Sequence, residues 1–345
     1  MKIAFIDRDG TLIFEPPDTQ QIDSLEKLRI LPGVIEGLKS LIKQDYRLVM
    51  VTNQDGLGTP AFPEDAFHVP QQRLIELLKQ EGITFYQVLV CPHRPEDDCP
   101  CRKPKPGLVR KLIDDGQIDA GSIMIGDRET DQVFAAGIGV TFFSMKTNEV
   151  FPRVAMVKRV STETNVVAGV NLCGKGKYQV ETGLNFLNHM LEQFSKHSLI
   201  DLTLSAKGDL RIDEHHTVED IALVLGEALR NALAEKKGIQ RYGFLLPMDD
   251  TLAEVAIDLG GRPYLVFNAE FKREMVGDLP TELVKHFFRS LADAMKANIH
   301  INVRYSENDH HKIEAIFKAF AKAMKMACEK DSRRIDILPS TKDLL

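Results

Sequence analysis

The pattern His-His-x-x-Glu occurs twice in this chain, at positions 215–219 and 310–314. Residues three or four positions apart lie on the same face of a helix, so Glu219 can approach His215 or His216. Adjacent histidines differ by about 100° around a helix, so their rings cannot easily bind one ion from the same direction. If both are ligands, they serve different metals, and the same holds for His310, His311 and Glu314.

Each pair also has an isolated histidine upstream, His189 before the first and His286 before the second, among apolar residues at helical spacing. Together these residues divide evenly into two metal sites, each with imidazole ligands and one carboxylate. Nitrogen-rich sites suit Mn²⁺, Fe²⁺ or Zn²⁺ rather than Ca²⁺ or Mg²⁺, and room for substrate on a six-coordinate ion favours Mn²⁺. A helix surface or a structural core histidine is the alternative for any single residue, but the repetition argues against coincidence.

Carboxylates follow apolar runs in the N-terminal part as well. Asp7 and Asp9 come directly after "KIAFI", and Asp127 ends "SIMIGD". One carboxylate could attack phosphorus while another moves a proton, and Asp127 could complete an Mg²⁺ site of oxygen ligands. A turn without function is the alternative for Asp-x-Asp alone. The residues that could hold a phosphoryl group nearby are Thr52, Asn53 and Lys103.

A histidine lies among three of the five cysteines, in the spacing C-x-H-x₅-C-x-C. Three thiolates and one imidazole form a tetrahedral zinc set with no open position, which is typical of a structural site. The ligands would be Cys91, His93, Cys99 and Cys101. Zinc there would fix the loop that carries Arg102 and Lys103; free thiols are the alternative. Cys173 and Cys328 have no such neighbours in the sequence and are interpreted as ordinary cysteines.

These residues need elements that bring them together, and 345 residues favour two domains. The first part alternates short apolar runs with helical patterns, which predicts an α/β domain with a doubly wound parallel sheet. Ligands bind beyond the carboxyl ends of the strands in such sheets. The predicted strands are Lys2–Ile6, Arg47–Asn53, Tyr86–Val90 and Ser122–Asp127, with helices over 33–44 and 71–82.

The alternation stops after about residue 145, and we place the boundary near Val150, which gives domains 1–150 and 151–345. In the second, strands followed by helices occur twice over, which predicts an α+β domain made by internal duplication. Its predicted strands are 166–172, 200–208, 252–261, 264–271 and 299–305. Its long helices are Val218–Glu235, Thr281–Ala297 and His311–Glu329.

The composition narrows the class of protein. A net charge of −6 argues against a nucleic-acid-binding surface. No apolar run approaches the ~20 residues of a membrane span, and the acidic N-terminus is unlike a signal peptide. We therefore expect a cytoplasmic protein that acts on small molecules, in which clustered cysteines bind metal rather than form disulfides.

The first half resembles the haloacid-dehalogenase-like phosphatases through "FIDRDGTL", "VTNQ", "RKPKPG" and "IGDRETD". The resemblance implies Asp7 as a nucleophile that forms an aspartyl-phosphate and Asp9 as general acid and base. Thr52 and Lys103 would hold the phosphoryl oxygens, with Asn53 and Arg102 as further substrate contacts. Asp127 would hold Mg²⁺ together with Asp7 and the Asp9 backbone.

The cysteine loop is similar to the branch of that family that acts on histidinol phosphate or on heptose bisphosphate. The stretch "FEPPDTQQIDSLEKL" favours histidinol phosphate, whose cationic amine would meet Glu15. A sugar phosphate remains the alternative substrate.

The second half resembles imidazoleglycerol-phosphate dehydratases over nearly all of residues 154–345, through "HHTVED", "GRP", "HFFRSL", "NDHHKIEAIFKAF" and "LPSTK". The resemblance implies a site with two Mn²⁺ built at subunit contacts, within a homo-oligomeric shell of 24 subunits. It implies dehydration of D-erythro-imidazole-glycerol phosphate to imidazole-acetol phosphate, with manganese acting as Lewis acid on the substrate's imidazole. A shell that binds metal without catalysis is the alternative.

The same resemblance implies roles for residues outside the metal ligands. Glu163 would lie near the substrate as acid or base, and His197 falls in a substrate-lining stretch. The phosphate would be bound by Arg241, Arg262, Ser340 and Lys342. Asn188 stands where the family has aspartate before the metal histidine, which changes the charge beside His189. Together the two resemblances predict a bifunctional enzyme of histidine biosynthesis.

Overall fold

The computed structural model describes residues 1–145, 151–242, 244–331, 333 and 337–342. The chain divides into two compact units, Met1–Pro152 and Arg153–Leu345. Val150, near which the sequence places the boundary, lies outside the described residues. Within the described ranges, no helix combines the length and the apolar character that crossing a bilayer would require.

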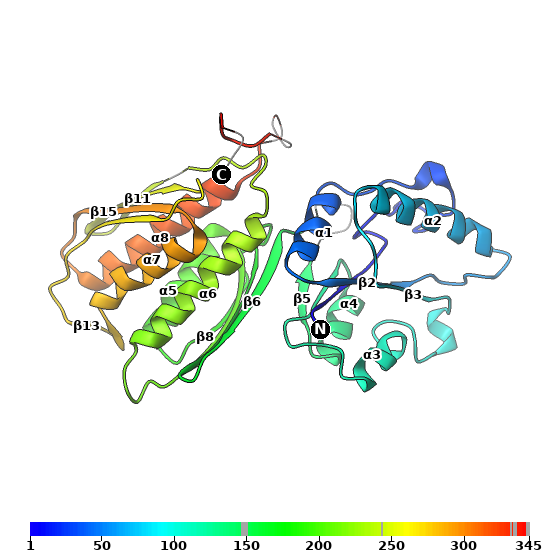
Figure 1. Cartoon of the computed structure of the whole chain (residues 1–345), viewed down its shortest axis with the longest axis horizontal. Coiled ribbons are helices and arrows are strands. Elements are labelled where there is room, and N and C mark those ends of the chain that lie inside the picture. Colours follow the sequence, from blue (N-terminus) through cyan, green and yellow to red (C-terminus); the bar gives the residue numbers. More distant parts are fainter. Residues whose placement is uncertain (146–150, 243, 332, 334–336, 343–345) are drawn as a thin grey trace. The chain divides into compact units, whose positions relative to one another are not determined.

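The first unit is built on a five-stranded parallel sheet in the order β3-β2-β1-β4-β5. Helices α1 and α2 lie on one side of it and α3 and α4 on the other (Figure 1). The central strands are buried along their whole length, as both covered faces require, which confirms the predicted doubly wound sheet. The strands are β1 (Ile3–Ile6), β2 (Arg47–Asn53), β3 (Gln87–Cys91), β4 (Ile123–Gly126) and β5 (Thr141–Ser144); the helices are α1 (Val34–Lys43), α2 (Glu64–Gln80), α3 (Arg110–Asp114) and α4 (Glu129–Gly137).

The sequence pattern located the strands of this unit better than its helices. The predicted strands correspond closely to β1 through β4, whereas β5, α3 and α4 were not predicted. Helix α2 begins at Glu64, well before the predicted start at residue 71, and contains Pro70. Proline disfavours a helix interior because it lacks an N–H, so the pattern suggested a start after Pro70.

The second unit contains two four-stranded sheets with the same topology, β6-β7-β9-β8 and β10-β11-β15-β12. In each sheet the first two pairings are antiparallel and the last is parallel. Each half of this unit has the same order of elements along the chain: three strands, a helix, a strand and a helix. The predicted duplication is therefore confirmed. The first repeat has β6 (Val154–Val160), β7 (Thr164–Asn171), β8 (Tyr178–Glu181), α5 (Asn185–Ser198), β9 (Asp201–Gly208) and α6 (His215–Leu233).

The second repeat follows the same order and adds a short hairpin. Its elements are β10 (Leu245–Met248), β11 (Thr251–Asp258), β12 (Tyr264–Asn268), β13 (Met275–Val276), β14 (Leu279–Pro280), α7 (Glu282–Met295), β15 (Asn298–Tyr305) and α8 (Asp309–Cys328). The hairpin β13–β14 lies between β12 and α7, where the first repeat has only residues 182–184 between β8 and α5.

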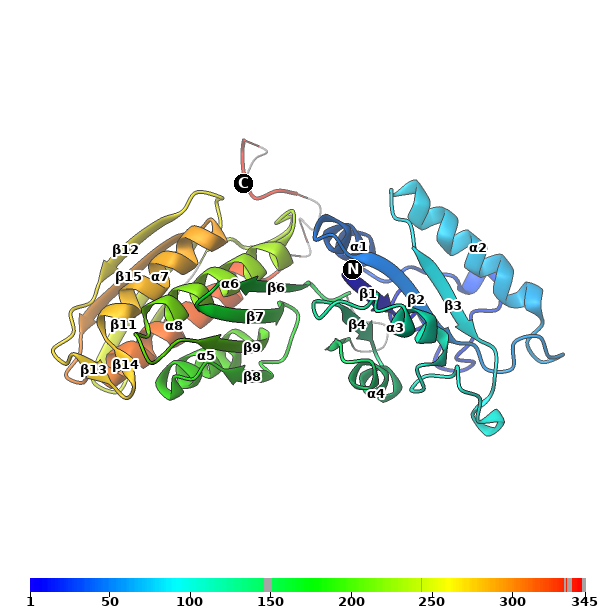
Figure 2. The same ribbon diagram turned by 60° about the horizontal axis from the view of Figure 1, so that its bottom comes forward.

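The four helices of the second unit lie between its two sheets, as the two views show (Figures 1 and 2). Strand β9 alternates buried and exposed residues because one face packs on these helices while the other faces outward. Helix α5 packs on α8, and α6 packs on α7, so each helix contacts a helix of the other repeat. One apolar core runs through both repeats.

Candidate functional site

The chemistry of the first unit gathers at the carboxyl ends of neighbouring parallel strands. Asp7 follows β1, Thr52 and Asn53 end β2, and Asp127 follows β4. Ligands of such sheets bind at this edge. A cavity of about 410 Å³ opens there, and the predicted residues that line it are Asp7, Asp9, Glu15, Thr52, Asn53, Arg102 and Lys103.

Lys103 is the cation at the centre of this cavity. Its buried ammonium donates to Asp7 Oδ1 at 2.7 Å and to Asp131 Oδ1 at 2.6 Å. Burial alone would lower the pKa of Lys103, but the Asp7 and Asp131 carboxylates outweigh it and raise that pKa. The Asn53 side chain donates to the Lys103 carbonyl at 3.2 Å and accepts from the Lys103 amide at 3.0 Å. Asn53 therefore supports Lys103, which the sequence did not indicate.

Asp9 is held through both carboxylate oxygens. Arg8 Nη1 donates to Oδ1 at 2.7 Å, and Gln54 Nε2 donates to Oδ2 at 2.5 Å. Gly10 follows in a left-handed conformation, φ 71°, which lets the chain turn directly after the carboxylate. Burial raises the pKa of Asp9, and the Arg8 guanidinium opposes that rise. A carboxyl with a raised pKa can carry a proton to a leaving group.

Asp131 is a candidate metal ligand that sequence reasoning missed. Oxygens of Asp7, Asp127 and Asp131 lie within 4.8 Å of one another, and this all-carboxylate set suits Mg²⁺. A Cβ on Gly126 would lie 2.4 Å from Asp131 Oδ2, so glycine leaves room for this carboxylate. Burial and the nearby Asp7 raise the pKa of Asp131 to about 6, against the effect of Lys103. The signal was its place in "IGDRETD", one helical turn after Asp127.

Two predicted substrate contacts already have partners of opposite charge. The buried Glu15 carboxylate pairs with Arg128, and Arg102 pairs with Asp55. Burial raises the pKa of Glu15, and Arg128 opposes that rise. Glu15 is thus part of an ion pair on the cavity wall, and its predicted contact with a substrate amine stays a prediction.

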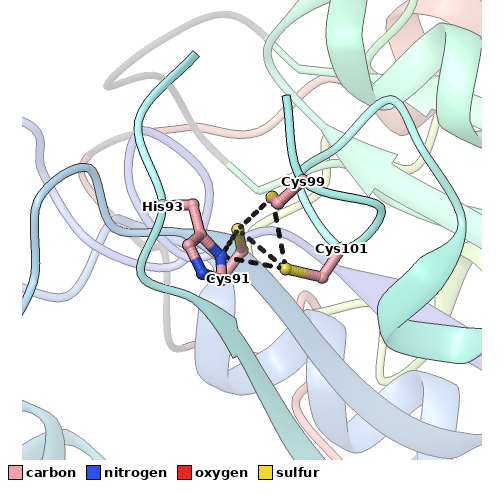
Figure 3. A group of neighbouring side chains, drawn as sticks. All are labelled: Cys91, His93, Cys99 and Cys101. Carbon is pink, nitrogen blue, oxygen red and sulfur yellow. Dashed lines mark hydrogen bonds between the residues drawn. The ribbon is translucent and has the colours of Figure 1, made fainter. Parts of the chain in front are cut away.

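The three cysteines and the histidine of the predicted zinc loop converge at the end of β3 (Figure 3). Cys91 Sγ lies 3.6 Å from Cys99 Sγ, 3.3 Å from Cys101 Sγ and 3.6 Å from His93 Nδ1. Ligands about 2.3 Å from a tetrahedral zinc have nearly this mutual spacing. Burial raises the pKa of Cys91 to about 12, so a cation is needed to make it a thiolate ligand. These four side chains could therefore hold a metal ion together.

In the second unit, six of the eight predicted metal ligands form two clusters. The first cluster consists of His189 from α5 with His310 and Glu314 from α8. The second cluster consists of His215 and Glu219 from α6 with His286 from α7. Each cluster therefore combines the isolated histidine of one repeat with the histidine and glutamate of the other repeat.

The spacing within the clusters fits a cation better than direct hydrogen bonds. His286 Nε2 lies 3.6 Å from Glu219 Oε1, and His310 Nε2 lies 3.5 Å from Glu314 Oε2. The His286 nitrogen is buried and has no hydrogen-bond partner among the described residues. A buried polar atom without a partner is costly, and a metal ion would satisfy it.

The second histidine of each pair, His216 or His311, lies outside both clusters and has an acidic partner of its own. The rings of His215 and His216 are nearly perpendicular, at 86°, and so are those of His310 and His311, at 89°. His216 Nδ1 lies 3.1 Å from Glu163 Oε2, and His311 Nδ1 lies 2.5 Å from Asp250 Oδ1. The hydrogen bond that the His311 ring donates to Asp250 raises the pKa of His311, and the same contact lowers the pKa of Asp250 to about 2.

The remaining predicted residues of the second unit have hydrogen-bond or ion-pair partners within the chain. His197 Nε2 lies 3.0 Å from Gln193 Oε1, and Asn188 Oδ1 accepts from Thr182 at 2.6 Å. Arg241 pairs with Asp258 and donates to the Pro339 carbonyl at 3.0 Å, next to Ser340. The Ser340 hydroxyl accepts from the Lys342 amide at 3.2 Å, and the Arg262 carbonyl accepts from Asn298. Arg241 thus lies against the segment that carries Ser340 and Lys342.

Comparison with known proteins finds similarities to each unit separately and to both units together. Residues 182–324 match the family model described as imidazoleglycerol-phosphate dehydratase, and residues 2–148 match the one described as polynucleotide kinase 3 phosphatase. The crystal structure of imidazoleglycerol-phosphate dehydratase from Staphylococcus aureus is 39% identical, with a TM-score of 0.48. It covers 52% of this chain and 99% of that one.

Relatives that span both units are also similar over their full length. The "Histidine biosynthesis bifunctional protein HisB" of Bacteroides fragilis is 46% identical, over 100% of this chain and 99% of the relative. The protein of the same name from Stenotrophomonas maltophilia is 48% identical, over 99% of each chain. The chain therefore belongs to the HisB family of bifunctional histidine-biosynthesis proteins.

Proposed function

We propose that the two activities of this family are divided between the units, with the phosphatase in residues 1–150 and the dehydratase in residues 151–345. The chain is a bifunctional enzyme of histidine biosynthesis that combines imidazoleglycerol-phosphate dehydratase and histidinol-phosphate phosphatase activities. The ranges of the two family matches, 2–148 and 182–324, support this division. The full-length similarity favours histidinol phosphate over heptose bisphosphate as the phosphatase substrate.

In the phosphatase, Asp7 is the nucleophile and Asp9 is the general acid and base. Asp7 attacks phosphorus and forms an aspartyl-phosphate, while the P–O bond to histidinol breaks and Asp9 gives its proton to the leaving oxygen. Asp9 then takes a proton from the water that hydrolyses the aspartyl-phosphate, which releases phosphate. The raised pKa of Asp9 supports its protonated state at the start of this cycle.

The other cavity residues bind and position the phosphoryl group. Lys103 aligns Asp7 through a 2.7 Å contact and supplies positive charge, and Thr52 and Arg102 line the same cavity. Asp7, Asp127 and the Asp9 backbone would hold Mg²⁺, with Asp131 beside them. When bound, Mg²⁺ supplies positive charge to the phosphoryl oxygens.

The metal of the cysteine loop is a structural zinc in this proposal. Four ligand positions are filled by Cys91, His93, Cys99 and Cys101, which leaves none open for substrate. The loop continues directly into Arg102 and Lys103. Zinc would therefore act on catalysis through the position of those two cations.

In the dehydratase, the two clusters together with His216 and His311 would hold two Mn²⁺ per site. Each cluster in one chain has two imidazoles and one carboxylate, and His216 or His311 of a neighbouring subunit would supply the third imidazole. When bound, Mn²⁺ acts as a Lewis acid on the substrate's imidazole. Glu163, beside His216, takes the carbon-bound proton as the neighbouring C–O bond breaks, and it gives that proton to the departing hydroxyl group, which leaves as water. The enol that remains tautomerises to the ketone product.

The phosphate of this substrate would be bound by Arg241, Arg262, Ser340 and Lys342, with His197 lining the site. Arginine and lysine suit this anion, and the contact of Arg241 with Pro339 supports a shared pocket. Sharing of ligands between chains supports a homo-oligomer, for which we propose 24 subunits. We expect the enzyme to work in the cytoplasm.

The observation that carries the dehydratase proposal is the pairing of each isolated histidine with the histidine and glutamate of the other repeat. The full-length chain with Mn²⁺ and imidazoleglycerol phosphate should form the ketone product, while with Mg²⁺ and histidinol phosphate it should release phosphate. Metal bound without ketone would instead support a non-catalytic shell. A higher kcat/KM on heptose bisphosphate than on histidinol phosphate would overturn the phosphatase assignment.

A further inference from the structure

The connection between β12 and α7 distinguishes the two repeats. It spans residues 269–281 and contains the hairpin β13–β14, and we name it the clamp loop. The matching connection in the first repeat is only residues 182–184, between β8 and α5. An insertion in only one copy of a duplicated fold suggests a role that the other copy does not have.

The tip of the clamp loop caps a helix of the other repeat. The Asp278 carboxylate accepts from the backbone amides of Asn185 at 2.6 Å and Phe186 at 2.9 Å, and from Asn185 Nδ2 at 3.1 Å. The residue before α5, Leu184, provides no side-chain cap, so Asp278 satisfies amides that have no partner within the helix. A Cβ on Gly277 would lie 3.0 Å from Phe186 Cβ, which shows how closely the tip packs on α5.

The base of the clamp loop is bound by the first turn of α8. The buried Asp309 carboxylate accepts from the amides of Lys272 and Arg273, both at 2.8 Å. Lys312, also buried, donates to the Glu270 carbonyl at 2.5 Å and to Asp309 at 2.7 Å. One segment therefore holds the starts of both α5 and α8 through hydrogen bonds.

Helices α5 and α8 are the two that supply the first cluster, His189 with His310 and Glu314. Phe186, whose amide is capped by Asp278, places its ring edge-on to the His310 ring, with centroids 5.2 Å apart. We propose that the clamp loop fixes the spacing of this cluster, with Asp278 and Asp309 as positioning residues. The second cluster, between α6 and α7, has no matching insertion in the first repeat. The two metal sites of one chain consequently differ in how firmly the protein positions their ligands.

The test measures metal binding in the assembled, full-length protein, and it rests on the proposed dehydratase function. Mn²⁺ bound per chain is determined by equilibrium dialysis for the wild type, Asp278→Ala and Asp278→Asn. We expect Asp278→Ala to weaken one class of Mn²⁺ site by about 10-fold or more and to leave the other unchanged. Asp278→Asn should lose less Mn²⁺ affinity, because the amide oxygen of the new side chain can still accept a hydrogen bond from the start of α5.

Asp201→Ala is the matched control, because Asp201 accepts from the amides of Lys175 and Lys177 at 2.8 and 2.9 Å in a loop that holds no cluster residue. It should bind Mn²⁺ like the wild type. Equal weakening of both sites, or of neither, in the Asp278 variants would overturn the proposal. If Asp278→Ala does not assemble to wild-type mass, Asp278→Asn is judged by the same criterion. A wild type that binds no Mn²⁺ would instead count against the dehydratase assignment itself.

Discussion

The two catalytic regions of this chain differ in how much of the site one copy of the chain can build. In the first unit, the proposed nucleophile Asp7, the proposed acid Asp9 and the buried Lys103 line one cavity within a single chain. In the second unit, each cluster has two imidazoles and one carboxylate, while His216 and His311 lie outside both clusters. The difference teaches that one chain gathers the whole proposed phosphatase site at the edge of a parallel sheet, whereas the duplicated fold leaves two predicted ligands outside its clusters, which we propose serve another copy of the chain.

The largest expected effect separates the two sites outright. Asp7→Asn should lower phosphatase kcat by about 1,000-fold or more, because it removes the attacking carboxylate. Dehydratase activity of the same preparation should stay at the wild-type value. Ketone formation and phosphate release, measured side by side, check this, and a joint loss would mean that the sites are not independent.

Removal of His216, which lies outside the clusters, should affect only the dehydratase site that we propose is shared between subunits. His216→Ala should reduce bound Mn²⁺ and dehydratase activity by about 100-fold and shift the assembly toward smaller species, because a ligand of another chain's metal is lost. Metal analysis with light scattering measures both effects, and phosphatase activity is the internal control. His300→Ala is the matched histidine control, since His300 faces the Tyr264 ring and belongs to neither cluster. An unchanged mass for His216→Ala would argue that each chain completes its own site.

The cysteine loop allows a test of how far the phosphatase site depends on a bound zinc ion. Cys101→Ser should abolish zinc binding and lower phosphatase kcat/KM by about 10- to 100-fold, because Lys103 loses its fixed position. Lowering the pH should release zinc from the wild type, because protons compete with zinc for the Cys91 thiolate, whose pKa is raised by burial. Zinc content against pH measures this. Cys173→Ser is the control and should change neither quantity.

The smallest expected effect concerns the orientation of Asp9. Gln54→Ala removes the 2.5 Å contact to Oδ2 and leaves the Arg8 contact to Oδ1 intact. A hydrogen bond to a charged group contributes about 1.5–3 kcal/mol, so kcat should fall by roughly 10-fold or more with KM little changed. Steady-state kinetics on histidinol phosphate decides it, and a change in KM alone would assign Gln54 to substrate binding.

Residue spacing predicted those features that depend on short stretches of chain. The strands before Asp7, Asn53 and Asp127 are apolar runs that end in polar residues, and their parallel order places those ends together. The cysteine loop is equally local. The separation of the two histidines of each pair, with one inside a cluster and the other outside, agrees with their offset of about 100° around the helix.

The remaining features depend on contacts between distant segments, which spacing does not encode. The pairing of α5 with α8, and therefore of His189 with His310, is set by packing of the two repeats. Asp278 reaches α5 across 93 sequence positions, and Arg128 reaches Glu15 across 113. Asp131 was missed because a helix start, absent from the predicted elements, brings it back toward Asp7.

The crossed composition of the clusters has a consequence for each repeat taken alone. Because each cluster takes its isolated histidine from one repeat and its His-Glu pair from the other, a single repeat holds no complete cluster. Two identical copies of one repeat, packed about a two-fold axis, would form both clusters at once. A chain cut down to one repeat should therefore keep no complete cluster unless two such halves associate.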